Sequence, residues 1–360
     1  MRKIFITFVL LTSAVLAGAN TVINVETAGT LKTLIGENKL TTTDLVVSGN
    51  LNGSDIQVIR EMAGIMLSGG PSGGKLARLD MTDANIVAGG DYYMYDYNTY
   101  ENFYTADNEL GKYMFYNCPA LQSVVIPKSV TAIGVEAFQD CKGLTSIDIP
   151  VSVANIGQGA FCDCTEIGSV AVPEGVTGIF KWTFYGCIKL LSVVLPASLT
   201  ELGEGAFMGC RELTELSVPE NVNIVPPSAF GNCKKLRKLS LPKAITQIGH
   251  YAASGCAALE ELYLYAENPP SCGFYPFNGV DKQKCKLYVP KDTKVRYQSA
   301  GGFSDFNNII EIETSGIAAI LEDNNETVHY TIGGIPTKTP LKGINIVRTR
   351  DGKTRKIVVR

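Results

Sequence analysis

The sequence of 360 residues has few of the residues on which common enzyme mechanisms depend. It contains only two histidines, His250 and His329, and neither lies near a second metal ligand in the sequence. Histidine is the commonest metal ligand and a frequent general base. The chain also lacks the G-x-S-x-G and H-E-x-x-H motifs of hydrolases and metalloproteases. We therefore predict a protein that is not an enzyme and that has no metal site and no cofactor.

One class of enzyme needs no histidine. Glycoside hydrolases use a pair of carboxylates as acid and base or nucleophile. Nothing in the spacing of Asp80, Asp83 and Asp91 marks them as such a pair. A carbohydrate-active enzyme therefore stays a distant third interpretation.

The chain also has no large excess of positive or negative charge. The chain has 32 Lys and Arg against 35 Asp and Glu, a net charge of −3. Proteins that bind nucleic acid gather positive charge on one face, because the phosphate backbone is anionic. The composition argues against a nucleic-acid partner. The basic residues that gather between 342 and 360 fit the solvated side of hairpin strands.

Long apolar runs are missing from all but the first residues. The chain begins with basic Met1-Arg2-Lys3, continues with the apolar run Ile4–Leu16, and then has small residues Ala17-Gly18-Ala19. This order predicts a secretory signal peptide over residues 1–19. No later run approaches the roughly 18 residues of a membrane-spanning helix. We expect an exported protein without a transmembrane span, extracellular or at the cell surface, with outer-membrane association open.

Cysteine is not scarce, and its spacing is regular. Seven of the ten cysteines recur every 23 residues: Cys118, Cys141, Cys164, Cys187, Cys210, Cys233 and Cys256. Proline keeps the same step: Pro127, Pro150, Pro173, Pro196, Pro219 and Pro242. A constant interval of this length indicates a solenoid of stacked repeats. We expect the cysteine column to face inward, where a small thiol packs well.

Each part of the repeat has a mechanical interpretation. In Val124-Val125-Ile126 the first and third side chains face the core and the second faces outward, as in a strand with one buried side. Pro127 ends that strand. Gly134 and its copies are expected to supply a turn, and Ala137-Phe138 returns apolar side chains to the core. One rung buries too little to fold alone, so the rungs must stack.

The repeat resembles a known family. The pattern L-x-x-V-x-I-P-x-x-V-T-x-I-G-x-x-A-F-x-x-C, from Leu121 to Cys141, is similar to the 23-residue leucine-rich repeat of the BspA-like, or Treponema-type, family. The likeness covers residues 111–265, about seven rungs. It implies an α/β solenoid with a parallel β ladder, export from bacteria such as Bacteroides and, for some members, adhesion to host proteins or other cells.

Three copies depart from the pattern. The third reads Gly178-Ile179-Phe180-Lys181-Trp182-Thr183-Phe184, without the turn glycine and the alanine. The fifth has Pro226-Pro227 at the turn, and the sixth has Ala252-Ala253 in place of Ala-Phe. We expect these rungs to bend the stack or to end it.

The flanks are less regular. Residues 20–110 are expected to form an atypical N-terminal cap, with strands at 44–47 and 79–81 and a helix from Ser54, as N-cap, to Ala63. Residues 266–315 are predicted to form a C-terminal cap with a last strand at Lys286–Pro290. Residues 316–360 are predicted to form a small β-rich tail module, either a sorting or attachment signal or a packing unit.

A segment rich in aromatic residues between the cap and the solenoid is the first candidate binding site. Its candidate ligand-binding residues are Tyr92, Tyr93, Tyr95, Tyr97, Tyr100 and Tyr104. Tyrosine gives a large contact area at low entropic cost, so a tyrosine-rich loop suits a binding surface. The alternative is that the rings fold over the first rung and complete its core.

The outward positions of the ladder are the second candidate. They include Val125, Asp148, Val194 and Tyr263, on a mild, partly apolar surface that suits a protein or a glycan. An unused sheet face has the same composition, so both interpretations stay open. Cys272 and Cys285 fall outside the cysteine register and form a candidate disulfide in an exported chain.

Two functions from different classes fit these features. The first is a non-catalytic, adhesin-like binding protein, exported or on the cell surface, that contacts a protein or glycan of a host or bacterial surface. The second is a structural spacer or envelope component without a specific ligand. Burial of the tyrosine-rich segment favours the second, and a large exposed patch favours the first.

Overall fold

The computed structural model describes residues 20–312 and the segments 328–331, 336–337, 343–348 and 354–359. The predicted signal peptide, residues 1–19, lies outside the described residues, as do parts of the predicted tail module. Within the described ranges, no helix has the length and apolar character needed to cross a membrane.

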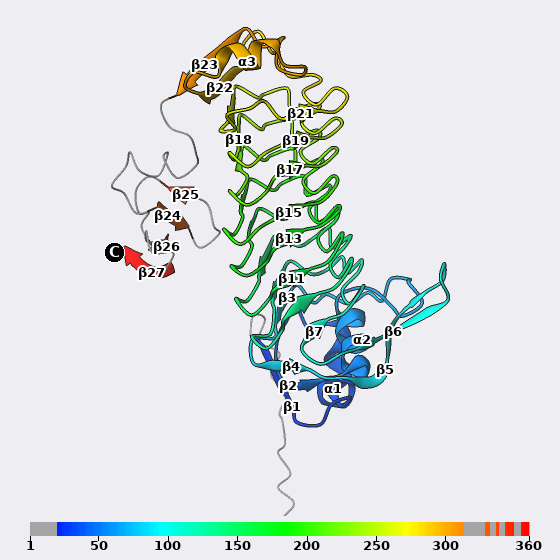
Figure 1. Ribbon diagram of the computed structural model, residues 1–360. Coiled ribbons are helices and arrows are strands. Elements are labelled where there is room, and N and C mark those ends of the chain that lie inside the picture. The colour runs from blue at the N-terminus through cyan, green and yellow to red at the C-terminus, as the bar shows by residue number, and fades with distance from the viewer. Residues whose placement is uncertain (1–19, 313–327, 332–335, 338–342, 349–353, 360) are drawn as a thin grey trace, which may run out of the picture.

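The chain folds as a leucine-rich-repeat solenoid with two parallel ladders of short strands, each divided into three hydrogen-bonded sheets (Figure 1). Equivalent residues of neighbouring rungs pair with an offset of 23, as in Ser123↔Ser146 and Glu215↔Lys238. The first ladder comprises β1 (Thr21–Val25), β2 (Asp44–Leu51), β3 (Arg78–Asp80), β8 (Ser123–Val125), β10 (Ser146–Asp148), β12 (Ser169–Ala171), β14 (Ser192–Val194), β16 (Glu215–Ser217), β18 (Lys238–Leu241), β20 (Glu261–Leu264), β22 (Lys286–Pro290) and β23 (Asn308–Ile312). The second comprises β7 (Glu109–Leu110), β9 (Ala132–Ile133), β11 (Asn155–Ile156), β13 (Gly178–Ile179), β15 (Glu201–Leu202), β17 (Ile224–Val225), β19 (Gln247–Ile248) and β21 (Ser271–Cys272).

A stack of phenylalanine rings runs through the core. Successive ring centroids lie between 5.3 and 6.2 Å apart, and successive ring planes are within 20° of parallel. The stack comprises Phe115, Phe138, Phe161, Phe184, Phe207 and Phe230, all fully buried. Each ring therefore closes the core of its own rung and packs against both neighbours, so the rungs depend on one another for their stability.

The cysteine column has a more specific role than the expected packing. Six buried thiols each donate a hydrogen bond of 3.0 to 3.2 Å to a phenylalanine carbonyl of the preceding rung. The pairs are Cys141–Phe115, Cys164–Phe138, Cys187–Phe161, Cys210–Phe184, Cys233–Phe207 and Cys256–Phe230. A weak donor thus satisfies a buried acceptor in every turn. Burial raises the pKa of Cys118, at the start of the column, to about 11.

The glycines that recur in the repeats do not have the predicted role. Gly134, Gly157, Gly203 and Gly249 do not have positive φ. A Cβ built on Gly203 would lie 2.2 Å from the backbone nitrogen of Lys181 in the preceding rung. The prediction that these glycines supply a turn conformation was wrong, because their role is to let two backbones approach closely. The left-handed conformation is taken two residues later, for example by Glu136.

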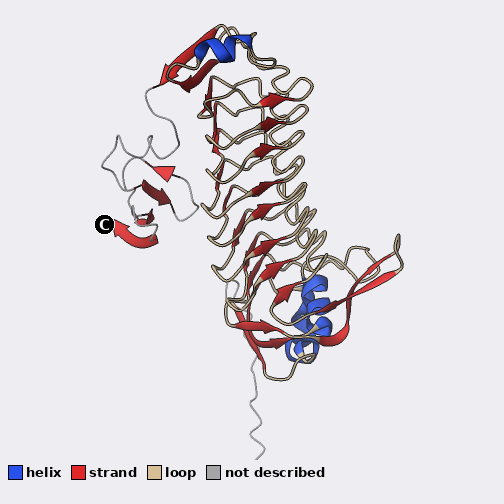
Figure 2. Cartoon of the chain, viewed as in Figure 1, coloured by secondary structure: helices blue, strands red, loops and turns tan. Residues whose placement is uncertain are grey.

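The N-terminal region extends the first ladder. β1 pairs with β2, β2 with β3, and β3 with β8, all in parallel. The strands of this region therefore continue the ladder at its N-terminal end. Short β4 (Ala84–Ile86) also pairs with β2. Helices α1 (Leu31–Ile35) and α2 (Gly53–Met62), with the 3-10 helix η1 (Gly36–Leu40), lie in this region (Figure 2).

The N-cap of helix α2 (Gly53–Met62) lies two residues before the predicted one. Its N-cap is Asn52, whose side-chain oxygen accepts a hydrogen bond of 3.0 Å from the N–H of Ser54. Asp55 accepts in return from the N–H of Asn52, also at 3.0 Å, which completes a capping box. The assignment of Ser54 as N-cap was therefore wrong. Gly64, with φ of 102°, follows the helix.

The C-terminal end of the solenoid is closed by β22, helix α3 (Lys294–Ser299) and β23. Predicted strand Lys286–Pro290 is confirmed as β22, and β23 adds one more parallel strand that the sequence did not predict. Tyr297 and Phe303 are buried beside Phe277. Further along, β24 (Val328–Thr331), β25 (Pro336–Thr337), β26 (Gly343–Arg348) and β27 (Thr354–Val359) form an antiparallel sheet in the order β25-β24-β26-β27.

Candidate functional site

The tyrosine-rich segment forms a β-hairpin, whereas the sequence predicted a loop. Strands β5 (Gly89–Asp96) and β6 (Glu101–Thr105) pair in antiparallel fashion, with a register shift between Gly89 and Met94. Tyr100, with φ of 62°, lies in the connecting turn. The hairpin extends away from the solenoid on the side of the turns (Figure 1).

Helix α2 holds the base of the hairpin. The Ser54 hydroxyl donates to the carboxylate of Asp91 at 3.1 Å and accepts from the Asp91 N–H at 3.0 Å. The Gln57 amide donates to the carbonyl oxygen of Tyr92. On the second strand, the Thr105 hydroxyl contacts the carbonyl oxygens of Val87 and Gly89. The hairpin is therefore fixed at its base, although its tip projects into solvent.

The buried side of the hairpin completes the first rung. Tyr93 is fully buried, and its hydroxyl donates a hydrogen bond of 2.8 Å to the carbonyl oxygen of Lys112. The pKa of Tyr93 is raised because burial disfavours the phenolate. Phe103 packs edge-on against Tyr113 at 5.3 Å, and Lys112 lies over both rings. Tyr93 thus has the packing role that was the alternative for the whole segment.

A buried arginine fixes the same junction. Arg60 of α2 is almost fully buried and donates from Nη1 to the carbonyl oxygens of Tyr113, Met114 and Tyr116, at 3.0 to 3.3 Å. These carbonyls belong to the first turn of the solenoid. A charged donor shared by three carbonyls orients the helix that carries the hairpin.

The other five tyrosines remain accessible. Tyr97, Tyr100 and Tyr104 are 54% to 78% exposed, and Tyr92 and Tyr95 are half-buried. The rings pair edge to face, Tyr92 with Tyr104 at 6.3 Å and Tyr95 with Tyr97 at 4.7 Å. Beside them lies an open hollow of about 640 Å³ that is lined by Glu61, Met66, Leu67, Ser68, Tyr92, Tyr95, Tyr97 and Asn102.

The hairpin carries negative charge only. Between Gly89 and Glu109 the sequence has five acidic residues and no Lys or Arg. The backbone N–H of Asn98 donates to the carboxylate of Asp96 at 2.8 Å, and this hydrogen bond lowers the pKa of Asp96. Asp96 is therefore ionised at neutral pH, so the exposed tyrosines lie on an anionic surface.

The ladder candidates are spread along the length of the solenoid. Val125 and Val194 are half-buried in β8 and β14, and Asp148 is exposed in β10. Tyr263 of β20 stacks on Tyr288 with centroids 4.3 Å apart, and the ammonium of Lys238 lies 5.1 Å from its ring centroid. The ladder runs along the side of the solenoid away from the hairpin, so the two candidate surfaces do not form one site (Figure 1).

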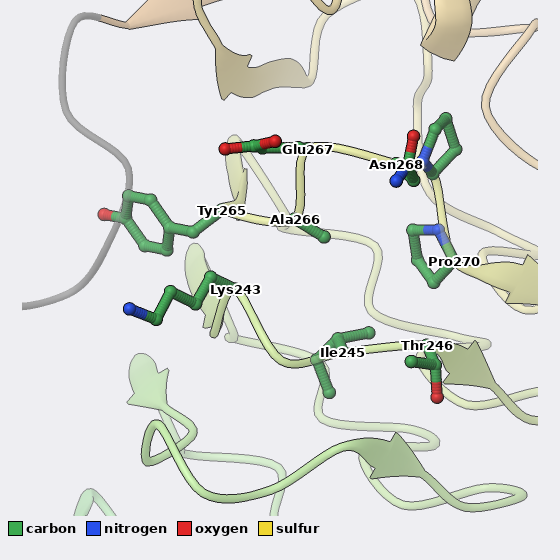
Figure 3. A pocket seen from close by; sticks show the side chains of 9 residues that line it. Lys243, Ile245, Thr246, Tyr265, Ala266, Glu267, Asn268 and Pro270 are labelled. Atoms are coloured by element: carbon green, nitrogen blue, oxygen red, sulfur yellow. The ribbon is translucent and has the colours of Figure 1, made fainter.

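A second hollow lies where the repeat register breaks. It has about 560 Å³ and is lined by two successive rungs, with Lys243, Ile245 and Thr246 on one and residues 265–270 on the next (Figure 3). Its rim carries one charge of each sign, on Lys243 and Glu267. Within the described residues, no group of three or more His, Cys, Asp or Glu side chains is arranged to hold a metal ion.

The candidate disulfide is not formed. Cys272 lies in β21 of the second ladder, whereas Cys285 immediately precedes β22 of the first, and both thiols are free. The Cys272 thiol contacts the carbonyl oxygen of Pro270, and that of Cys285 contacts the carbonyl oxygen of Lys286. The predicted bridge was therefore wrong, because the two cysteines belong to different ladders. Cys162 is also free.

This arrangement predicts the thiol count of the exported protein. Without prior reduction, the denatured chain should give ten thiols with Ellman's reagent, and a count of eight would show one bridge. The folded chain should react slowly at pH 8, because burial raises the pKa of Cys272 to about 11 and keeps the column protonated. Fast reaction of several native thiols would contradict the buried column.

Comparison with protein families identifies the repeat. The model of the BspA type leucine-rich repeat region matches in six copies over residues 108–237 and 224–324, which is more than half of the chain. The chain belongs to this family. The match begins close to β7 and continues beyond β23.

Solved structures of similar proteins come from several bacteria. A leucine-rich repeat protein of Bacteroides ovatus is 31% identical over 47% of this chain and 47% of its own, with a TM-score of 0.43. The leucine-rich repeat protein of Treponema pallidum is 32% identical over 42% of this chain and 71% of its own, with a TM-score of 0.40. This chain thus spans about half the length of the B. ovatus protein. Comparison with curated proteins found no match.

One group of exposed aromatic residues was not predicted from the sequence. Tyr251, Phe274 and Tyr275 lie at the turns near the C-terminal end of the solenoid and are strongly exposed. His250, which is also exposed, stacks on Phe274 with centroids 4.8 Å apart. The signal was obscured because Gly249 and Gly273 are 24 residues apart, so an alignment at 23 residues does not place these rings in one column.

Proposed function

We propose that this chain is a non-catalytic, adhesin-like binding protein, exported and held at or released from the cell surface, and that hairpin β5–β6 recognises a protein partner. The single observation that carries the proposal is the set of exposed tyrosines on an anchored, anionic hairpin. Tyrosine is enriched at protein interfaces, since it combines apolar area with a polar hydroxyl. A rigid base lowers the entropic cost of presenting these rings.

The charge of the hairpin indicates the chemistry of the partner. Asp96 and Glu101 face each other across the strand pair at the tip, beside Tyr97 and Tyr100. Acidic groups at the rim of an interface favour a basic partner and mainly increase the rate of association. We therefore propose a protein surface with Lys or Arg around an apolar patch, and binding that weakens as salt is added.

The solenoid supports this role as a scaffold. We propose the division predicted from the sequence: a signal peptide at 1–19, an N-terminal cap with the hairpin at 20–110, the repeats at 111–265, a C-terminal cap at 266–315 and a tail module at 316–360. In this organisation the hairpin lies at one end of a rigid rod. The rod would hold it at a distance from whatever the C-terminal region contacts.

The proposal predicts loss of protein binding on removal of the exposed rings. The purified chain and a Tyr97→Ser/Tyr100→Ser/Tyr104→Ser variant would be tested by surface plasmon resonance against an array of immobilised extracellular-matrix proteins. We expect saturable binding by the wild type and a dissociation constant raised at least about tenfold in the variant. Tyr93 is left unchanged, because its burial makes it part of the core.

A matched control uses exposed rings elsewhere on the chain. Tyr251→Ser/Tyr275→Ser alters two exposed tyrosines at the far end of the solenoid and should leave this binding unchanged. Circular dichroism would establish that both variants are folded. Binding that is lost equally in the two variants, or absent from the wild type across the array, would contradict the proposal and favour a structural spacer.

A further inference from the structure

Four aromatic side chains form an exposed array on two adjacent turns. His250 and Tyr251 follow β19, and Phe274 and Tyr275 follow β21. His250 stacks on Phe274 at 4.8 Å and Tyr251 on Tyr275 at 6.0 Å, with ring planes within 28° of parallel. Phe274 and Tyr275 are 70% and 66% exposed. We call these four residues the aromatic platform.

The platform is not explained by the stability of the fold. Tyr251 and Tyr275 have φ of 54° and 51°, a left-handed conformation that bulky residues avoid. The same position has a positive φ in the earlier turns too, where it is taken by Gly159 and Gly205 but also by Tyr113, Glu136, Trp182 and Ser228. Tyr251 and Tyr275 are also exposed, so core packing does not offset the strain. The conformation therefore belongs to the repeat, and what distinguishes Tyr251 and Tyr275 is that their rings are exposed and stack on each other across two adjacent turns.

The surroundings of the platform are uncharged. The last three turns, residues 226–232, 249–255 and 273–279, contain no Asp, Glu, Lys or Arg. Each of the five earlier turns contains at least one such residue: Lys112, Glu136, Asp163, Lys181 and Glu204. The turns that expose the rings therefore contain no charged residue. Electrostatic complementarity therefore favours a neutral ligand.

Hydrogen-bonding groups accompany the rings. The N–H of Phe274 donates to Nδ1 of His250 at 2.8 Å, so in the neutral imidazole the proton is on Nε2, which can donate to a ligand. Among the described residues, the hydroxyls of Tyr251 and Tyr275 make no hydrogen bond within the chain. Each ring thus combines an apolar face with a free polar group at its edge.

We propose that the aromatic platform binds a neutral polysaccharide. A pyranose ring has an apolar C–H face, which matches the open faces of Phe274 and Tyr275, and hydroxyls, which match His250 Nε2 and the tyrosine hydroxyls. A neutral polysaccharide built from such rings carries no charge, so an uncharged protein surface is suited to bind it. This site is separate from the hairpin and adds a second type of ligand to the proposed function.

The test is affinity electrophoresis of the purified chain in native gels. The gels would contain, one at a time, laminarin, xyloglucan, galactomannan or the anionic polygalacturonate. We expect retardation by at least one of the three neutral polysaccharides and none by polygalacturonate. In the variant Tyr251→Gly/Phe274→Ser/Tyr275→Gly, the dissociation constant should rise at least about tenfold. The hairpin variant Tyr97→Ser/Tyr100→Ser/Tyr104→Ser should be retarded like the wild type.

Thermal unfolding separates binding from a structural role. Glycine fits the left-handed conformation at positions 251 and 275, so the platform variant should have an unchanged or higher Tm. A marked fall in Tm would show that the rings stabilise the fold, and would overturn the proposal. No retardation of the wild type by any neutral polysaccharide, or equal retardation of wild type and platform variant, would also overturn it. Binding of a proline-rich peptide in place of every polysaccharide would assign the platform to peptide recognition instead.

Discussion

Replacing Gly203 by alanine should lower the free energy of unfolding by about 3 kcal/mol. The added Cβ would lie 2.2 Å from the nitrogen of Lys181 and 2.3 Å from the carbonyl carbon of Phe180. Both atoms belong to the backbone of the preceding rung and cannot rotate away. The rungs must therefore separate, which weakens the second ladder between β13 and β15.

Gly168→Ala is the matched control for this change. The nearest atom to a Cβ at Gly168 is the carbonyl oxygen of Thr145, at 3.9 Å, which is an ordinary contact. Gly168 also lacks a positive φ, so alanine should change the free energy of unfolding by no more than about 0.5 kcal/mol. Urea unfolding followed by circular dichroism measures both variants. Equal stability of the two would contradict the assignment of Gly203 to close backbone approach.

These glycines show where sequence reasoning reaches its limit. A recurring glycine is required either by a positive φ or by the close approach of another chain segment, and the sequence does not distinguish the two. The structure places the positive φ at Glu136, Trp182 and Tyr251, residues that give no sign of it. The column of glycine was recognised, but its cause depends on the distance between rungs.

The rungs themselves could be predicted because their period sets the direction of each side chain. Once Cys141 and Cys164 are one rung apart, the strand, the buried cysteine and the buried phenylalanine follow from one repeat unit. The observed pairing Ile147↔Val124 and the burial of Phe138 confirm this part of the prediction. A 23-residue repeat constrains every position at once, so small departures do not change the fold.

The tyrosine-rich segment was predicted less completely because its partners come from distant parts of the chain. The sequence gives no sign that Tyr93 meets the carbonyl of Lys112, or that Ser54 and Gln57 of α2 bind the base of the hairpin. The two interpretations of this segment, a binding surface and a part of the core, therefore each apply to some of its residues. Tyr93 belongs to the core, whereas Tyr97 and the other exposed rings form a surface.

Phe184→Ala is the second substitution with a large expected effect. The ring lies between Phe161 and Phe207, with centroids 5.4 and 5.5 Å away, and has no exposed surface. Removing it leaves a cavity between two rings that are held by their own rungs. We expect a loss of about 3 to 5 kcal/mol in the free energy of unfolding.

Leu191→Ala, in the following rung, is the control for this loss. Leu191 is 44% exposed, so its truncation removes little buried area and should cost less than about 1 kcal/mol. Denaturant titration of both variants gives the comparison. Because this ring contacts both neighbours, hydrogen exchange in Phe184→Ala should increase in β10 and β14, the strands of the two neighbouring rungs, as well as in its own rung. An increase confined to residues 164–186 would show that the rungs are stable independently, contrary to a continuous phenylalanine stack.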